Sequence, residues 1–404
     1  MSVLRGLVIV GAGAAGIGAA IAARAKRIDA LIVEAKDRLG GRAHSIDWKG
    51  YKLDLGCTWL HSAERNSLRA EAERIGVPVD QNPVSWFDQF RDLGFSPDEQ
   101  EDAFGAFEAL EERMRTDPPS SDCAADAVDP AGRWNPFLNV LSGYINGAQL
   151  SQVSVADWLA YDNSAGEQNL RLPNGYGGLL AKLGQQLEHH LATPVIAISR
   201  LPESVQIETT EGVIAAERVI VTMPTATLSR IRFDPPIDGL YEAAGQLPLG
   251  IADKLFLALE EPEAFPHNAH LLGNPHSPNT GSYFIQPMGM PVIEGFFGGD
   301  GARALEELGE DGAFAFAIDE IAALLGTAIR KRLTPIAVSA WTREEWIGGS
   351  YSHALPGFAA ARGCLADAGD ERIAFAGEAV SRQDYSTAHG AFDSGVAAVQ
   401  RLFA

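Results

Sequence analysis

Cysteine, positive charge and long apolar runs are all scarce in this sequence, and each shortage excludes a class of protein. The 3 cysteines, Cys57, Cys123 and Cys364, show neither CxxC nor Cys/His spacing, so no disulfide framework and no metal site is expected. Lysine and arginine number 32 against 53 acids, a net charge of −21. This excess of negative charge disfavours nucleic acid and anionic membrane surfaces as partners, and it would attract a cationic ligand.

The lack of long apolar runs bears on location. No run of about 18 or more apolar residues occurs, and the short apolar run at residues 7–10 leads into glycine instead of a cleavage site. The sequence therefore predicts neither a membrane span nor a secretory signal. The few unpaired cysteines are typical of a reducing compartment, so a cytoplasmic location is expected.

The N-terminal segment predicts a dinucleotide-binding unit. Residues 7–10 form a β-branched run typical of a buried parallel strand, and Gly11-Ala12-Gly13-Ala14-Ala15-Gly16 is a GxGxxG that precedes an Ala-rich helix. The glycines permit a tight turn, close approach of a pyrophosphate and close helix packing, and the helix N-terminus favours anions. A second strand at residues 30–33 ends at Glu34, an acid suited to an adenosine ribose.

The residues that follow carry a family resemblance. The string from Glu34 and Ala35 to Gly41 and Arg42 resembles the extended FAD-binding signature of the flavin amine oxidase superfamily. The resemblance implies FAD as the cofactor, with Arg42 brought to its phosphates. Thr58-Trp59-Leu60-His61 is similar to the Trp-x-His of spermine-type and acetylpolyamine oxidases. His61 can also be an ordinary hydrogen-bonded structural histidine.

Lys254 stands inside the apolar, strand-like run of residues 248–257. A lysine in a strand usually lies on a solvated face. The family, however, has a lysine at the matching position that holds a water against flavin N5. The resemblance therefore implies a catalytic role for Lys254.

The stretch of residues 341–352 looks like the family segment that packs a tryptophan near the flavin and presents a tyrosine to the substrate. By that match Trp341 packs on the flavin and Tyr351 forms one wall of the amine-binding cage, although Tyr351 can also be a packing residue. Ser350 stands where the mitochondrial monoamine oxidases carry a flavin-linked cysteine. Non-covalent FAD is therefore expected.

The C-terminal block predicts a buried strand that runs into Gly377 and Glu378, followed by a Gly/Ala-rich helix. The amides at the start of such a helix can stabilise negative charge on a reduced flavin. The string from Ser386 to Gly395 resembles polyamine oxidases and lysine-specific demethylases, with Thr387 where monoamine oxidases place a second cage tyrosine. His389 within it can be purely structural.

Together, the dinucleotide fingerprint and the resemblance define the expected site. The catalytic residues are Lys254, Tyr351, Thr387 and His61. Val195 matches a family strand that contacts the adenine, but it can equally be an ordinary strand residue. The expected cofactor contacts are Gly11, Gly13, Ala15, Gly16, Glu34, Ala35, Gly41, Arg42, Gly56, Thr58, Val195, Trp341, Gly377, Glu378, Thr387 and Ala388.

The expected fold is α/β with two domains. A chain of 404 residues exceeds what one core usually serves, roughly 250–300 residues. The resemblance implies a Rossmann-like FAD domain from residues 1–79, 174–243 and 345–404, interleaved with an α+β substrate domain from residues 80–173 and 244–344. Alternating strand and helix signals support α/β for the first domain.

The expected function is FAD-dependent oxidative deamination of a small-molecule amine. A hydride passes to flavin N5, the imine hydrolyses to an aldehyde or ketone, and oxygen reoxidises the flavin to give hydrogen peroxide. An L-amino-acid oxidase on the same scaffold is an alternative, but it would want a bidentate pocket arginine, which the motifs do not supply. A third hypothesis is a protein that binds flavin, has no catalytic activity and acts through its interactions. The sequence leaves the amine and the oligomeric state, monomer or homodimer, open.

Overall fold

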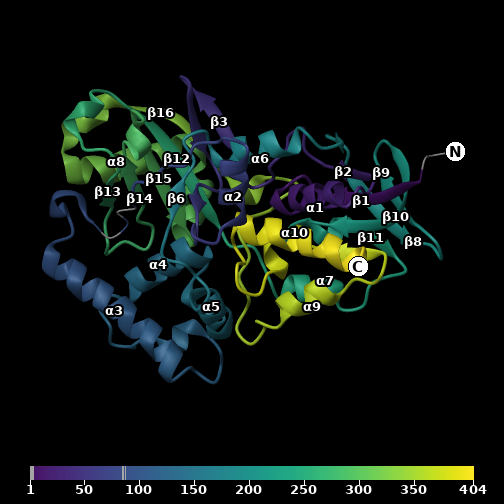
Figure 1. Cartoon of the computed structure of the whole chain (residues 1–404). Coiled ribbons are helices and arrows are strands. Elements are labelled where there is room, and N and C mark those ends of the chain that lie inside the picture. Colours follow the sequence, from purple (N-terminus) through teal and green to yellow (C-terminus); the bar gives the residue numbers. More distant parts are fainter. Residues whose placement is uncertain (1–3, 84–85, 87) are drawn as a thin grey trace.

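The computed structural model describes residues 4–83, 86 and 88–404. Figure 1 shows two sheets side by side, with the termini beside the first sheet and the helices of residues 97–162 below the second. The helices are α1 Ala14–Ala25, α2 Ser67–Arg74, α3 Pro97–Thr116, α4 Asn135–Asn146, α5 Val155–Asp162, α6 Tyr176–Gly184, α7 Leu240–Gly245, α8 Asp300–Leu325, α9 Ala361–Asp367 and α10 Ala388–Leu402.

The first sheet has the strand order β11-β8-β9-β10-β1-β2-β7, with β17 paired to β10. Its central pairs, β10 with β1 and β1 with β2, are parallel, as the expected βαβ unit requires. The strands are β1 Arg5–Val10, β2 Ala30–Val33, β7 His189–His190, β8 Val195–Arg200, β9 Val205–Thr209, β10 Gly212–Val221, β11 Arg232–Asp234 and β17 Ile373–Phe375.

Both faces of this sheet are buried, which explains the unbroken apolar run of β1. Leu7 and Ile9 belong to a core shared with α1, α6 and α10, whereas Val8 and Val10 belong to a second core shared with α7 and α9. Strands covered by helices on both faces read as continuous hydrophobic sequence. The prediction of an α/β fold with a Rossmann-like domain is confirmed.

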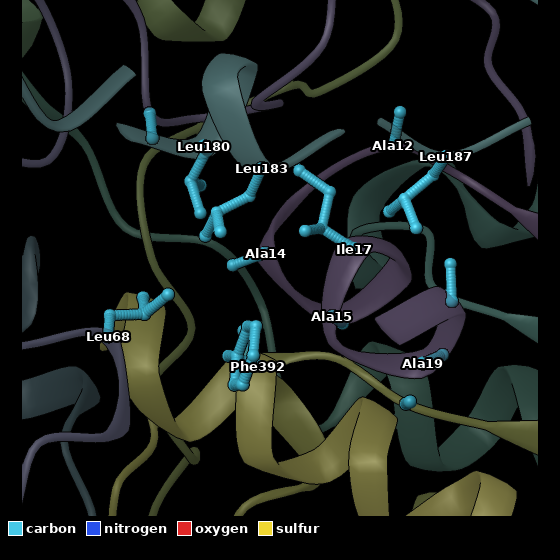
Figure 2. Close-up of a cluster of buried hydrophobic side chains, with 14 of the residues drawn as sticks. Ala12, Ala14, Ala15, Ile17, Ala19, Leu68, Leu180, Leu183, Leu187 and Phe392 are labelled. Carbon is cyan, nitrogen blue, oxygen red and sulfur yellow. The ribbon is translucent and has the colours of Figure 1, made fainter. Parts of the chain in front are cut away.

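Helices α1 and α10 pack closely because glycines remove side chains at their crossing. A Cβ at Gly18 would lie 2.4 Å from the carbonyl oxygen of Phe392, and one at Gly395 would lie 1.9 Å from that of Ala15. Figure 2 shows Phe392 of α10 beneath α1 in this core. The contact brings helix α1 and the last helix together, so the glycine fingerprint that ends at Gly16 meets the string that begins at Ser386.

The second sheet is antiparallel, with the order β13-β14-β15-β12-β16, and α8 packs on it. Its strands are β12 Ala252–Leu259, β13 Ala269–Leu272, β14 Ser282–Ile285, β15 Val292–Gly298 and β16 Leu333–Val338. Two short ribbons complete the described strands: β3 Ser45–Trp48 with β4 Tyr51–Asp54, and β5 Trp59–Leu60 with β6 Leu170–Arg171.

The turn cluster at residues 173–178 and the sequence after it predict a helix from Leu179 to about His189. In the structure α6 begins at Tyr176 and ends at Gly184, and His189 lies in strand β7. The amides of Ile32 and Glu34 in and after β2 donate to the carbonyl oxygens of Glu188 and His190. Pairing with the edge of the sheet therefore overrides the local preference for helix.

The interleaved two-domain division remains a proposal. In its support, the strands of the first sheet lie at residues 5–33, 189–234 and 373–375, and those of the second lie between residues 252 and 338. Among the described residues, no helix is long and apolar enough to cross a membrane.

Candidate functional site

A hollow lies between the ends of β1 and β2 and the starts of α1 and α10, and its space, counted together with its opening to solvent, is about 1080 Å³. Its lining takes in most of the residues expected to contact the cofactor: Gly11, Gly13, Ala15, Glu34, Ala35, Gly41, Arg42, Val195, Gly377, Glu378, Thr387 and Ala388. Of the expected catalytic residues, Tyr351 and Thr387 also line it.

The glycines of the fingerprint do different things. At Gly13 an added Cβ would meet nothing within 4 Å, so the backbone there is open to a ligand in the hollow. Gly16 lies outside the lining, and a Cβ on it would stand 1.9 Å from the carbonyl oxygen of Gly11. Gly56 likewise packs its Cα against the Arg42 carbonyl, where a Cβ would stand 1.8 Å from the oxygen. Gly16 and Gly56 therefore lie outside the lining, and they allow the backbone segments behind it to pack closely.

Two helix N-termini point their backbone amides at the hollow. Helix α1 begins after Gly13, whose lack of a side chain leaves the first amides without a side-chain acceptor. Helix α10 begins after Thr387, whose hydroxyl accepts from the amide of Gly390 at 3.0 Å and donates to the carbonyl of Asp384 at 2.7 Å. The open start of α1 suits a phosphate, since free amides and the helix dipole both favour anions.

Glu34 stands at the end of β2, as the fingerprint requires. Its carboxylate accepts from the backbone amides of Ala12 at 2.6 Å and Lys36 at 2.8 Å. Burial raises the pKa of Glu34, and these backbone hydrogen bonds oppose that rise. The carboxylate is thereby fixed beside the turn of the GxGxxG, in the lining of the hollow.

Arg42 and Glu378 form an ion pair in the wall of the hollow. The Arg42 guanidinium donates to Glu378 at 2.9 Å and to the carbonyl of Ser350 at 2.6 Å. Glu378 also accepts from the hydroxyl of Ser352 at 2.6 Å and the amide of Ser386 at 3.0 Å. Burial acts to raise the pKa of Glu378, but the charges of Arg42 and Arg362 and these hydrogen bonds lower it overall.

Lys254 is buried, with 6% of its surface exposed, rather than on a solvated face. Its Nζ forms an ion pair with Glu294 of β15 at 3.0 Å and a hydrogen bond with the hydroxyl of Thr58. Thr58 directly follows Cys57, which lines the hollow. Lys254 therefore lies behind the residues that line the hollow, and Thr58 and Glu294 fix its amine from two sides. Thr58 was expected to contact the cofactor, but it contacts Lys254 and does not line the hollow.

The acids around Lys254 are buried too. Burial raises the pKa of Asp54 to about 6, and the positive charge of Lys254 acts against that rise. Glu294 differs, because the charges of Lys254 and Arg171 outweigh its burial and lower its pKa. Glu294 is therefore an anion at neutral pH, and it balances the lysine.

The aromatic residues of the site are anchored through their polar atoms. Tyr351 donates its hydroxyl to the carbonyl of Tyr144 at 2.7 Å, which fixes its ring against α4. Burial raises the pKa of Tyr351, which keeps the phenol neutral. Trp341 donates its indole N–H to the carbonyl of Leu55 at 3.0 Å and lies behind Gly56, outside the lining.

Each of the two histidines of the motifs, His61 and His389, contacts a polar side chain. His61 shares a 2.7 Å hydrogen bond between its Nδ1 and the side-chain oxygen of Asn169, and burial lowers its pKa to about 4. It is therefore neutral near pH 7. His389 of α10 lies 3.3 Å from the carboxylate of Asp384, which Arg65 also binds.

Sequence reasoning missed Glu294 and Arg171. Glu294 is the single acid in the apolar run of residues 291–297, the same signal that marked Lys254. Arg171 lies beside Glu294, with 3.9 Å between its Nη1 and a carboxylate oxygen, and its guanidinium stacks on the ring of Trp59 at 3.9 Å. No local pattern marks Arg171, because its neighbours come from strands far away in the sequence.

Known proteins resemble this chain over nearly its whole length. Polyamine oxidase 3 of Oryza sativa subsp. japonica is 28% identical over 433 residues, covering 97% of this chain and 88% of that protein. Lysine-specific histone demethylase 1B of Mus musculus is 27% identical and matches 99% of this chain over 53% of its own length. Wild-type putrescine oxidase bound to putrescine shares the fold, with a TM-score of 0.83, 18% identity and 100% of both chains covered.

Two family models match this chain. Residues 9–72 match the NAD(P)-binding Rossmann-like domain, which agrees with the β1-α1-β2 unit and its glycines. Residues 88–403 match the flavin containing amine oxidoreductases. Because this second match spans most of the sequence, the chain belongs to the flavin-containing amine oxidoreductase family, and it is a flavin-dependent amine oxidase.

Proposed function

We propose that the chain binds FAD non-covalently in the hollow and oxidises a small-molecule amine in front of Lys254. The observation that carries this is the buried Lys254–Glu294 pair joined through Thr58 to the wall of the hollow. A buried ion pair at the edge of a ligand cavity costs desolvation energy, and such costs cluster at functional sites. The glycine backbone at Gly13, the open start of α1 and Arg42 suit a dinucleotide's phosphates.

The chemistry that FAD supplies when bound is acceptance of a hydride from the amine's α-carbon at N5 and delivery of the electrons to oxygen, giving hydrogen peroxide. The imine product hydrolyses to an aldehyde or ketone. The protein needs no nucleophile of its own. Its residues orient the amine, exclude water and hold protons.

Each expected catalytic residue has a proposed task. Lys254 donates a hydrogen bond from Nζ to a water, and Thr58 and Glu294 keep that nitrogen in place. Tyr351, fixed by Tyr144, is one wall for the neutral amine, and Thr387 is the polar second wall. His61, neutral near pH 7, is a hydrogen-bonding residue beside Trp86, with ring centroids 6.3 Å apart.

Non-covalent attachment of the cofactor is directly testable. Ser350 lines the hollow, and its hydroxyl is not nucleophilic enough to replace the cysteine thiolate that links flavin in monoamine oxidases. Protein purified with its flavin should be yellow, and acid precipitation should release the colour into the supernatant. Flavin that stays in the washed, denatured pellet would show a covalent bond and contradict this part of the proposal.

The activity is tested by a peroxide-coupled screen of mono-, di- and polyamines beside L-amino acids. We expect peroxide formation with at least one class of amine in the presence of bound FAD. Flavin-loaded protein that forms no peroxide with any of them would favour the non-catalytic interpretation. A parallel assay with an artificial electron acceptor separates a missing substrate from an enzyme that reacts poorly with oxygen.

A further inference from the structure

Arg171 at the end of β6 is a buried cation whose donors are unused. Only 4% of the residue is exposed. Its Nε, Nη1 and Nη2 atoms are all buried, and none has a hydrogen-bond partner among the described residues. A guanidinium carries N–H donors in a fixed fork, and leaving buried donors unpaired costs stability. Such a group in a folded protein calls for an explanation, of which a ligand is one.

The fold directs Arg171 to the same place as the Lys254 cluster. Arg171 is paired directly opposite Trp59 in the β5–β6 ribbon, so both side chains lie on one face of it. Across from that face, Phe284 of β14 is paired directly with Glu294 of β15. The Arg171 guanidinium lies 3.9 Å from the centroid of the Trp59 ring and 4.5 Å from that of Phe284.

Glu294 does not satisfy Arg171. One of its oxygens is held by Lys254 at 3.0 Å, and the other lies 3.9 Å from Arg171 Nη1. The longer distance is an electrostatic contact but exceeds a hydrogen bond. Glu294 therefore forms its ion pair with Lys254, and the N–H donors of the Arg171 guanidinium have no acceptor among the described residues.

This arrangement distinguishes substrates by the charge at their far end. A second ammonium group on the amine would meet Arg171 while the nearest acid, Glu294, is already engaged. A carboxylate would meet a planar pair of donors between two aromatic rings, the geometry that guanidinium groups use to bind carboxylates. The rings hold the guanidinium plane in place and limit water around it.

We propose that Arg171 binds a carboxylate of the substrate, and that the enzyme oxidises amino carboxylates in preference to diamines. This rests on the proposed amine oxidation and names the substrate class for it. Arg171 lies outside the motif arginines Arg38, Arg42, Arg343 and Arg382. Within the part of the chain that the structure describes, those four contact backbone carbonyls or acids of their own neighbourhood: Gly41, Glu378, Glu306 and Asp367 respectively.

The test compares substrates that differ in the charged group they carry besides the reacting amine. The matched set is butylamine, putrescine and γ-aminobutyrate, with L-norvaline as an α-amino carboxylate, each assayed for kcat/KM with the holoenzyme. We expect one of the two amino carboxylates to exceed both butylamine and putrescine by about tenfold or more. Which of the two is preferred reports the spacing between the amine and the carboxylate.

Variants then assign the preference to Arg171. Arg171→Met should lower kcat/KM for the preferred amino carboxylate by about 100-fold, as truncation of a buried charge pair does, and should lower kcat/KM for butylamine by a clearly smaller factor. Arg171→Lys keeps the charge without the fork and should recover part of the loss. Arg232→Met, which alters a mostly exposed arginine, is the control and should change none of the substrates.

A binding measurement keeps the inference separate from the proposed function. Calorimetry should show butyrate or propionate binding to the holoenzyme and not to Arg171→Met. Carboxylate binding that depends on Arg171, without turnover of any amine, would support the inference and overturn the proposed activity. If the wild-type enzyme oxidises putrescine as efficiently as the amino carboxylates, the inference is overturned and the proposed function stands. This outcome is measured on the wild-type enzyme, so it does not depend on whether a variant folds.

Discussion

Lys254→Met should retain FAD but slow flavin reduction or reoxidation by on the order of a hundredfold, the usual scale for a positioned proton-handling group. The Lys254 amine is buried and fixed by Thr58 and Glu294, so methionine fills similar space without the charge or the hydrogen bonds. Anaerobic stopped-flow mixing with an amine measures reduction, and mixing the reduced enzyme with oxygen measures reoxidation. Unchanged rates in both half-reactions would remove Lys254 from the mechanism.

The variant needs a control for stability, because it leaves Glu294 buried and without its lysine. Removal of one partner of a buried ion pair costs about 3–5 kcal/mol. The double variant Lys254→Met/Glu294→Gln replaces the stranded acid with a neutral amide of the same shape. We expect it to recover most of the lost free energy of unfolding but none of the lost rate. A double variant that regains the rate would make Lys254 a structural residue.

Arg42→Met should yield protein that purifies largely without flavin. The guanidinium forms an ion pair with Glu378 in the wall of the hollow. Without it, the Glu378 carboxylate remains, and it would repel an anionic pyrophosphate. By analogy with other buried charge pairs, about 3–5 kcal/mol of binding free energy is lost, which weakens FAD binding by a factor of roughly a hundred to several thousand. Fluorescence titration of the apoprotein with FAD measures the change in Kd.

Two further variants test whether the change in Kd comes from the charge of Arg42. Arg42→Lys keeps the charge but loses the fork, so an intermediate Kd is expected. Arg42→Met/Glu378→Gln removes both charges of the pair and should bind FAD more tightly than Arg42→Met alone, since the repulsion is gone. A single Arg42→Met variant that binds FAD with the wild-type Kd would place the cofactor's phosphates elsewhere.

The first strand, its glycine turn and the helix after it were predictable from sequence, because they are local. The apolar run of β1, the spacing of Gly11, Gly13 and Gly16, and Glu34 at the end of β2 all report on one contiguous βαβ unit. Helix α10 was predictable for the same reason. Its contact with α1 follows only from the structure, through glycines on both helices.

The proposed substrate side was less predictable, because its residues meet through pairing between distant strands. Arg171 is opposite Trp59 only because β5 and β6 form a ribbon, and Glu294 reaches Lys254 only because β12 and β15 are neighbours. The predicted polar wall at Thr387 shows a related limit. Its hydroxyl caps α10, a use that sequence cannot separate from contact with a ligand.

The proposed amine oxidation is tested most directly by anaerobic mixing of the flavin-loaded enzyme with amines and amino carboxylates while the flavin absorbance is followed. We expect the oxidised flavin band to bleach with at least one of these substrates. We also expect the band to return when oxygen is admitted, with hydrogen peroxide formed in an amount equal to the flavin reduced. A band that stays unbleached with every amine and amino carboxylate, in protein with full flavin content, would contradict the proposed amine oxidation.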